Sequence, residues 1–262
     1  MRYRRYVALG DSCAEGLDDP YPDGTMYRGW TDLTATGLAA VSPRLEYANL
    51  AVRGRRLDQI LTEQVPIAVA QEPDLVTLFG GGNDLLQGRW QTTARSLDEI
   101  VSTMAEVART VVLFTLPDIA RLPGLWRLRP RVERLNDEIV AAGARHGALV
   151  LDVREDPYCN DERLYGPDRL HLGALGHQRV AAHLLGLLDV PAEPDWLAPL
   201  PPAVRDPLWH KAYAQWSWLR HFVYPAVHST VRNKLVGRQP GDGFLPKRPE
   251  LTPVTRFQRP VH

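Results

Sequence analysis

The stretch YVALGDS (Tyr6 to Ser12) is an apolar run that breaks on Gly-Asp-Ser. Its apolar part predicts a buried strand over residues 6–9, and the break places the Ser12 hydroxyl at the carboxyl end of that strand. In parallel α/β sheets, ligands bind outside the carboxyl ends of the strands. Ser12 is therefore a candidate nucleophile, although the same tripeptide also suits an ordinary turn.

Around this stretch, short apolar runs alternate with longer amphipathic ones along the chain. Strands are predicted over 6–9, 45–50, 75–79, 111–115 and 149–153, and helices over 29–41, 57–70, 96–109, 131–146 and 173–188. Strict alternation of strand and helix predicts right-handed crossovers and a parallel sheet that is covered on both faces. We therefore expect a three-layer α/β/α sandwich with a central parallel five-stranded sheet.

Three further segments carry polar groups to the same edge of the predicted sheet. They are NLAVRG (49–54), GGGND (80–84) and DRLH (168–171). The first two follow predicted strands, and the third lies just before the last predicted helix. Because the carboxyl ends of parallel strands share one edge, these segments should converge on Ser12.

A serine hydroxyl is a weak nucleophile near neutral pH and needs a neighbouring base. His171 is the candidate base, and Asp168, three residues earlier, can orient its ring so that Nε2 faces Ser12. The alternative is that Asp168 and His171 form a capping arrangement at the start of the last helix.

Attack on an ester carbonyl creates an oxyanion, which requires donors already directed at it. The candidates are the backbone N–H groups of Ser12 and Gly54 and the side-chain amide of Asn83. Glycine at position 54 permits a close backbone approach that a Cβ would obstruct. The glycine run 80–82 could alternatively bind phosphate, but it lacks the Lys and Ser/Thr of a phosphate-binding loop.

Together the four segments resemble those of the SGNH hydrolases, also called the GDSL esterase/lipase family. The resemblance covers about residues 4–190, and its one departure is Cys13, where the family name expects Leu. It implies a flavodoxin-like sheet with strand order 2-1-3-4-5 and no requirement for a metal or another cofactor. By motif position it assigns functional roles to Ser12, Gly54, Asn83, Asp168 and His171.

Composition sets further bounds. With 262 residues and 44% hydrophobic content, the chain can bury the core of one α/β domain and carry an appendage. Cys13 and Cys159 are in no metal-binding or CxxC spacing, so a disulfide framework is not expected. The basic start is followed by too short an apolar run for a signal peptide, and no stretch is long enough to span a membrane. We therefore expect a cytoplasmic protein without an integral membrane segment.

From Pro191 the amino-acid composition changes, because prolines become frequent and tryptophans follow. This change divides the chain into a hydrolase domain (1–190) and a Pro/Trp-rich extension (191–262). Residues 192–262 hold ten Lys and Arg against five Asp and Glu, so the extension is basic. Five of its aromatic residues are close together in sequence: Trp209, Trp216, Trp218, Phe222 and Tyr224.

The extension is too small for a core of its own, so we expect its aromatic residues to pack on the body or on a neighbouring subunit in a homo-oligomer. Residues 237–262 should be extended. A membrane surface is the alternative contact, since basic residues beside aromatic ones suit an interface. Nucleic-acid binding is not expected, because the prolines and aromatic residues have an evident packing use.

The functional hypothesis is a serine esterase that removes a short acyl or acetyl group from a small molecule or sugar through an acyl-enzyme intermediate. An acyltransferase would use the same site with an alcohol or amine in place of water. A noncatalytic binding or scaffold protein that has kept the site is the third hypothesis. Acyl length and the alcohol portion of the substrate are not encoded in these motifs.

Overall fold

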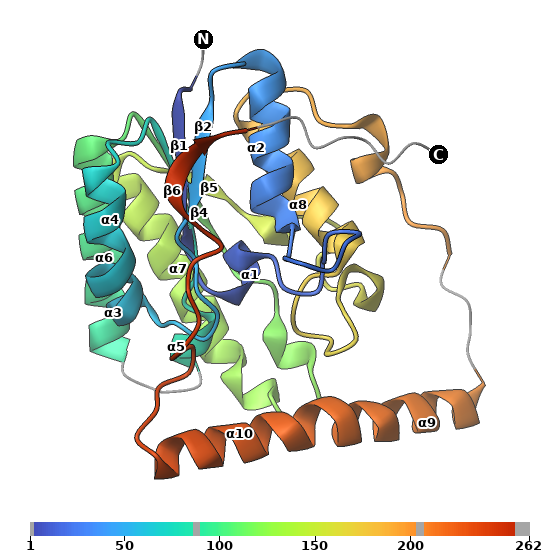
Figure 1. Ribbon diagram of the computed structural model, residues 1–262. Helices are drawn as coiled ribbons and strands as arrows, with labels where there is room; N and C mark the ends of the chain where they lie inside the picture. The colour runs from blue at the N-terminus through green and yellow to red at the C-terminus, as the bar shows by residue number, and fades with distance from the viewer. Residues whose placement is uncertain (1–2, 86–89, 203–206, 255–262) are drawn as a thin grey trace.

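The computed structural model describes residues 3–85, 90–202 and 207–254, and its centre is a six-stranded sheet (Figure 1). The strands are β1 (Arg5–Gly10), β2 (Glu46–Asn49), β3 (Leu75–Phe79), β4 (Thr110–Phe114), β5 (Leu149–Leu151) and β6 (Arg248–Pro253). Their order is β5-β4-β3-β1-β2-β6, and β1 to β5 are parallel. The predicted α/β class and the order 2-1-3-4-5 of the parallel strands are confirmed.

The apolar runs form the central strands because both faces of the sheet are covered. All five residues of β3 and five of the six residues of β1 are buried. Val7 of β1 lies opposite Ala48 of β2 on one side and Val76 of β3 on the other. A strand with helices on both faces has no polar side, which explains why these runs show no alternation.

Helices form the outer two layers (Figure 1). On one face are α2 (Gly29–Val41) and α8 (Ala174–Leu187), and on the other α3 (Leu57–Gln59), α4 (Val65–Ala70), α6 (Trp90–Val107) and α7 (Arg129–His146). The π-helical turn η1 (Ile60–Gln64) joins α3 to α4. Short 3₁₀ turns occupy the connections: η2 (Ile119–Arg121), η3 (Trp126–Leu128), η4 (Val153–Glu155) and η5 (Glu162–Leu164).

An aromatic cluster supports the carboxyl ends of β3 and β4. The Trp30 ring lies 4.6 Å from that of Phe114, which stacks on Phe79 at 5.0 Å, and all three side chains are buried. Trp30 Nε1 also donates a hydrogen bond of 2.9 Å to the carbonyl of Cys13. Cys13 lies in the one-turn helix α1 (Ser12–Glu15), so the core holds the segment that carries Ser12.

The prediction of five strands is wrong by one, because the extension adds β6 to the sheet. β6 pairs antiparallel with β2, with Tyr47 opposite Thr252 and a register shift between Tyr47 and Asn49. The sequence of β6, RPELTP, contains two prolines and lacks the apolar run of a central strand. Proline is tolerated on an edge strand, where one row of N–H groups needs no partner.

The rest of the extension forms the turn η6 (Pro194–Leu197) and a helical rod. The rod consists of α9 (Leu208–Trp218), the π-helical turn η7 (Leu219–Val223) and α10 (Tyr224–Leu235). It lies across the end of the molecule where α1 and the short helix α5 (Gly82–Leu85) are found (Figure 1). None of the helices in the described part of the chain combines the length and the apolarity needed to cross a bilayer.

Of the aromatic residues expected to pack on the body or on a neighbouring subunit, Trp218 is buried on the body, whereas Trp209, Trp216 and Tyr224 are exposed. Phe222 is exposed as well. The reason is geometric, since a single straight helix can turn only one side toward the body. Coverage by a neighbouring subunit stays a prediction. Residues 255–262, part of the stretch expected to be extended, lie outside the described residues.

Candidate active site

Ser12 is the first residue of α1, directly after β1. Asp11 caps this helix, and its carboxylate accepts a hydrogen bond of 3.1 Å from the N–H of Cys13. The chain thus turns sharply from strand to helix, as the Gly-Asp-Ser break predicts. The turn leaves Ser12 partly exposed above the core.

His171 and Asp168 complete a hydrogen-bonded series with Ser12. The Ser12 Oγ lies 2.8 Å from His171 Nε2, and His171 Nδ1 lies 2.5 Å from Asp168 Oδ2. With the Nδ1 proton donated to the carboxylate, Nε2 accepts from the hydroxyl. Asp168 Oδ1 also accepts the N–H groups of Leu170 and His171, at 2.8 and 2.9 Å. One oxygen of Asp168 therefore binds backbone and the other binds the ring. The alternative of a cap at the start of the last helix is wrong, because these N–H groups belong to the loop before α8, whose N-cap is Gly173.

The loop that carries this pair is attached to the rod. Trp218 Nε1 donates to the carbonyl of Asp168 at 2.8 Å, and Arg169 Nη1 donates to Gln215 Oε1 at 2.9 Å. Arg169 has a φ of 62°, in the left-handed region that a non-glycine residue adopts only when its surroundings enforce it. The rod thus helps to hold the loop on which His171 lies.

Electrostatics favour an ionised Asp168 and a more basic His171. Burial raises the pKa of Asp168, but the hydrogen bond and charge of His171 outweigh it and hold the pKa below its usual value. Burial lowers the pKa of His171, but the hydrogen bond and charge of Asp168, followed by the charges of Asp18 and Asp11, leave that pKa raised. A raised pKa makes the imidazole a stronger proton acceptor.

Asp18 belongs to the site although no motif singles it out. One ligand atom each of Asp18, Asp168 and His171 lie within 4.8 Å of one another. Asp18 has a φ of 65°, and burial and the neighbouring charge of Asp168 raise its pKa. The sequence contains no signal for it, because its approach to His171 depends on how the loop after α1 folds back.

Among the described residues, Asp18, Asp168 and His171 are also the one group whose spacing could hold a metal ion. Both ring nitrogens of His171 are already engaged, with Ser12 and with Asp168. A cation at this position would have to displace one of those hydrogen bonds, so the donor set fits a proton relay better than a metal centre.

Asn83, the second residue of α5, connects the other two predicted segments. Its Nδ2 donates to Asp11 Oδ2 and to the carbonyl of Arg55, both at 3.1 Å. Asp11 precedes Ser12 and Arg55 follows Gly54, so the side chain of Asn83 lies between the two expected N–H donors. Both of its amide hydrogens have acceptors, so an incoming oxyanion would have to replace one of them. Burial raises the pKa of Asp11 to about 6.

Gly54 is close to the end of the extension. It has a φ of +79°, and a Cβ at this position would lie 2.8 Å from the carbonyl carbon of Pro240. Gly241 has a φ of +88°, and its Cβ would lie 2.2 Å from the carbonyl oxygen of Arg53. This close backbone contact therefore requires glycine both at position 54 and at position 241. Within the described residues, the N–H groups of Ser12 and Gly54 donate to no protein acceptor.

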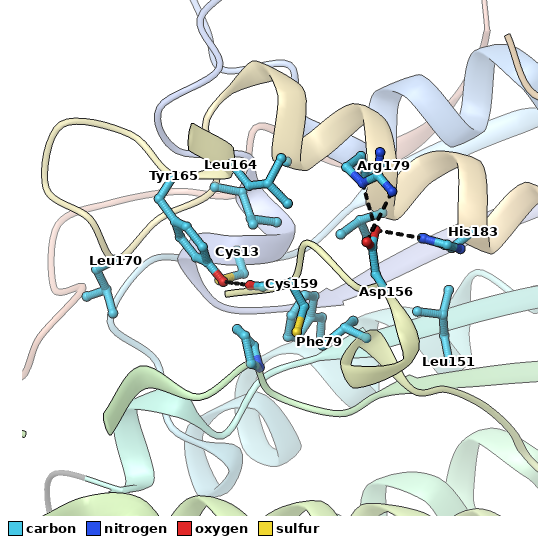
Figure 2. A pocket seen from close by; sticks show the side chains of 15 residues that line it. Cys13, Phe79, Leu151, Asp156, Cys159, Leu164, Tyr165, Leu170, Arg179 and His183 are labelled. Carbon is cyan, nitrogen blue, oxygen red and sulfur yellow. Dashed lines mark hydrogen bonds and ion pairs between the residues drawn. The ribbon is translucent and has the colours of Figure 1, made fainter. Parts of the chain in front are cut away.

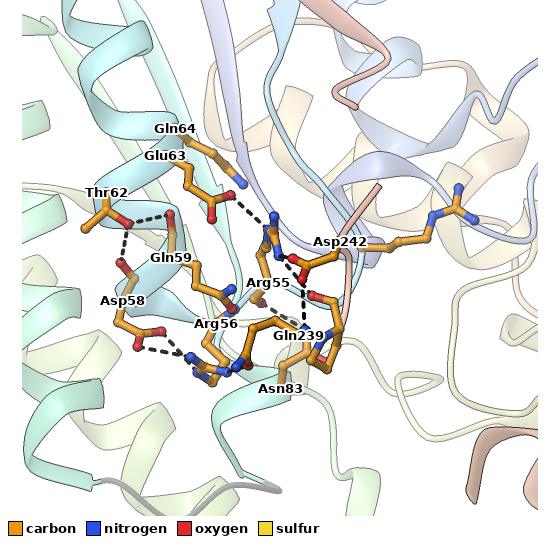
Figure 3. A network of polar contacts seen from close by, with 12 residues as sticks. Arg55, Arg56, Asp58, Gln59, Thr62, Glu63, Gln64, Asn83, Gln239 and Asp242 are labelled. Carbon is orange, nitrogen blue, oxygen red and sulfur yellow. Dashed lines mark hydrogen bonds and ion pairs between the residues drawn. The ribbon is translucent and has the colours of Figure 1, made fainter. Parts of the chain in front are cut away.

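Charged side chains secure the same contact (Figure 3). Arg55 Nη1 donates to the carbonyl of Pro240 at 3.1 Å and to Asp242 Oδ1 at 2.9 Å, while Arg55 Nε lies 2.8 Å from a carboxylate oxygen of Glu63. Gln239 accepts from Arg56 Nη1 at 3.2 Å. Residues 239–242 therefore brace the loop that carries Gly54, a role for which the sequence gives no local signal.

Two cavities adjoin the site. A larger cleft of about 600 Å³ has both charged and apolar lining residues, among them Asp18, Pro167 and Arg53, whose guanidinium lies over the rings of Tyr27 and Phe244 at 5.3 and 4.5 Å. An apolar cavity of about 40 Å³ lies beside Cys13, between Phe79, Leu164 and Tyr165 (Figure 2). The pair Asp156–Arg179 closes its far side, with two hydrogen bonds of 2.7 and 3.0 Å.

Comparison with known proteins agrees with this geometry. A family model described as "GDSL-like Lipase/Acylhydrolase family" matches residues 8–179. The chain belongs to this family. It is therefore a hydrolase of the esterase or acylhydrolase kind. No curated protein matches the chain.

Solved structures share the fold of this family member. A lipase/acylhydrolase from Enterococcus faecalis is 24% identical, with a TM-score of 0.57 over 72% of this chain and 98% of its own. The α/β hydrolase LAE5 from the metagenome of Lake Arreo is 22% identical, with a TM-score of 0.56 over 70% and 93%. The acetylxylan esterase Axe2 from Geobacillus stearothermophilus is 18% identical, with a TM-score of 0.53 over 70% and 93%. The family model ends at residue 179, before the extension begins.

Proposed function

We propose that this hydrolase is a serine esterase in which Ser12 attacks the carbonyl carbon of a carboxylic ester. The observation that carries the proposal is the series Ser12–His171–Asp168, joined by contacts of 2.8 and 2.5 Å. These residues come from segments 159 positions apart in the chain, so the contact is produced by the fold and is no local turn. A nucleophile, its base and an orienting carboxylate in hydrogen-bond contact form the working unit of such catalysis.

In the proposed first step, His171 Nε2 takes the hydroxyl proton while Ser12 Oγ forms its bond to the carbonyl carbon. The Asp168 carboxylate stabilises the imidazolium through the Nδ1 proton. The imidazolium then gives its other proton to the alcohol oxygen, which leaves as the intermediate collapses to an acyl-enzyme. Water repeats the sequence, releases the acid and restores the Ser12 hydroxyl.

The charge on the carbonyl oxygen would be met by the N–H groups of Ser12 and Gly54 and by the amide of Asn83. The first two are free to donate within the described residues. Replacing Asn83 with Ala should lower kcat by roughly 10²–10³ and leave KM nearly unchanged, because an oxyanion donor acts mainly in the transition state. A higher KM with an unchanged kcat would show that Asn83 is a ground-state contact instead.

The two cavities support a short acyl group on a polar alcohol. The apolar cavity beside Cys13 has room for only a small group, whereas the cleft at Asp18 and Arg53 is larger and has charged side chains among its lining. An acetylated sugar or similar small molecule has this division of polarity. One of the structures that share this fold is an acetylxylan esterase, which agrees with that substrate class.

The test is an acyl-length series of p-nitrophenyl esters, from acetate to octanoate, with wild-type protein and the Ser12→Ala variant. We expect wild-type turnover to be fastest with short chains and the variant to be inactive but folded. A fluorophosphonate probe should label wild-type protein and not Ser12→Ala. Equal turnover by both proteins, or no turnover by either, would overturn the proposal and favour a binding or scaffold role.

The His171→Ala variant examines whether base and nucleophile share one step. It should lose about as much activity as Ser12→Ala, and the double variant should be close to either single one. Independent, multiplicative losses would contradict a shared proton transfer. Circular dichroism of each variant provides the check that the fold is intact.

The size of the cleft at Asp18 and Arg53 favours acyl transfer as a second candidate activity of the same acyl-enzyme. At about 600 Å³ it has room for an acceptor alcohol beside the acyl group. Product analysis with an ester donor and sugar or glycerol acceptors decides the matter. Transfer product that exceeds free acid only when acceptor is present would identify a transferase, and free acid alone would identify an esterase.

A further inference from the structure

The outward side of the rod is a row of large aromatic side chains. Trp209, Tyr213 and Trp216 are 72%, 62% and 53% exposed, whereas Trp218 is 8% exposed and faces the body. At 3.6 residues per turn, the first three fall within an arc of about 60°, centred about 180° from Trp218. The rod therefore has one side attached to the body and an opposite side that presents aromatic rings.

The rings share one side of the rod, and two of them are neighbours. The rings of Tyr213 and Trp216 are 6.2 Å apart, and Leu219 and Tyr224 continue the exposed surface along the rod. Single exposed apolar side chains are normal on a protein surface, but a contiguous row marks an interaction site. Here the row is on the rod, which lies outside the family match.

The charge of the rod indicates what it contacts. Residues 208–235 contain four Lys and Arg, three His, and no Asp or Glu. The guanidinium of Arg220 lies 5.5 Å from the Trp216 ring, so a cation is placed within the aromatic row. Trp and Tyr combined with Lys and Arg, and without acidic residues, are the composition of helices that lie in the interface of an anionic bilayer.

A second copy of the chain fits this side less well. Two copies that met through the same side would bring two cationic surfaces together, with no acidic residue in either rod to pair with them. An anionic lipid surface provides the missing negative charge, and its interfacial region is an environment that aromatic rings favour. We propose that the outward side of the rod docks the protein on anionic lipid bilayers.

This docking goes beyond the proposed esterase activity and does not depend on it. It would place the active-site edge of the sheet toward the membrane, because the rod contacts the loop of Asp168 and Arg169 at that edge. Aromatic side chains would insert among the head groups, while Arg220 and the other cations bind lipid phosphates.

The test is co-sedimentation of the full chain with vesicles of phosphatidylcholine alone or mixed with phosphatidylglycerol. We expect binding to the mixed vesicles, little binding to phosphatidylcholine, and weaker binding at high salt. The triple variant Trp209→Ser, Tyr213→Ser, Trp216→Ser should lose at least about 10-fold in partitioning. The variant Arg220→Gln, Arg232→Gln should lose about 5-fold for each charge removed.

A matched control removes three exposed apolar side chains from other helices: Val41→Ser, Ile67→Ser and Leu187→Ser. It should sediment like wild type, and circular dichroism should show that both triple variants are folded. Failure of wild type to bind either vesicle, or equal binding by the aromatic variant, would overturn the proposal. Self-association that the aromatic variant abolishes, without vesicle binding, would also overturn it and assign this side to a second copy.

Discussion

Residues 208–235 and residues 239–254 are neighbouring parts of the extension, but only the second is built into the body. The rod buries Trp218 and exposes most of its other large side chains. The following segment adds β6 to the sheet, packs Gly241 against Arg53 and buries the ammonium group of Lys247. The difference shows that a segment outside the family match can contain both a structural part and a free surface.

The two parts also contact different halves of the candidate site. Residues 239–242 contact the loop of Gly54, which would bind the oxyanion, whereas the rod contacts the loop of Asp168 and His171. Changes in one part should therefore affect the oxyanion donors, and changes in the other should affect the base. The predictions below follow this division, from the largest effect to the smallest.

Truncation after Val236 should have the largest effect. It removes β6, exposes the edge of β2 and leaves the carboxylate of Asp32 without Lys247. We expect an aggregating protein or a loss of several kcal/mol, a large share of the stability of one domain. Thermal unfolding and sedimentation measure this. If the truncated chain unfolded at the same temperature as the full-length protein, the segment would contribute nothing to stability.

Lys247→Met examines the same contact with one substitution. Lys247 Nζ lies 2.9 Å from Asp32 Oδ1 and donates to the carbonyls of Tyr27 and Arg28 at 3.0 and 2.6 Å. Removing one partner of a buried pair leaves an uncompensated charge, so we expect a loss of about 3 kcal/mol in denaturant unfolding.

The control for Lys247→Met is Asp242→Asn, which breaks the more exposed pair with Arg55. Exposed pairs contribute little, so this change should cost less than about 1 kcal/mol. Equal losses in the two variants would mean that burial does not distinguish the two ion pairs.

Gly241→Ala should reduce turnover more than stability. The added Cβ would collide with the carbonyl of Arg53, next to Gly54, in a backbone conformation that alanine rarely adopts. We expect kcat to fall about 10-fold, with the pH dependence unchanged, because the oxyanion loop moves and His171 does not. Steady-state kinetics across pH measure both quantities. A displaced pH profile would contradict the separation of the two halves.

Trp218→Phe should give the smallest effect and the opposite pattern. It keeps an aromatic ring but removes the hydrogen bond to the Asp168 carbonyl, worth about 1 kcal/mol. His171 acts unprotonated, and Asp168 raises its pKa, so activity falls as pH drops below that raised value. A loosened Asp168 lowers the pKa of His171, so the acid limb of kcat/KM should move to lower pH while kcat falls. A change in kcat alone would leave the rod without a role in orienting the base.

The sequence by itself determined the elements whose signal is local. The helix predicted over 29–41 is α2, the helical stretch 57–70 is α3, η1 and α4, and the strand predicted over 75–79 is β3. The period of apolar residues encodes each of them, because each buries a face along its own length. The order of the blocks also predicted that Ser12 and His171 lie at one edge, where the structure places them 2.8 Å apart.

Tertiary structure alone decided the features that depend on distant partners. β6 has no strand pattern of its own and is a strand because β2 offers a free edge. Asp18 approaches Asp168 and His171, and Lys247 meets Asp32 of α2, only because the fold brings together segments that are far apart in sequence. The sequence also did not determine that Trp209 and Trp216 are exposed. An aromatic residue favours burial, but its presence in the sequence does not show whether the body has an uncovered surface on which it can pack.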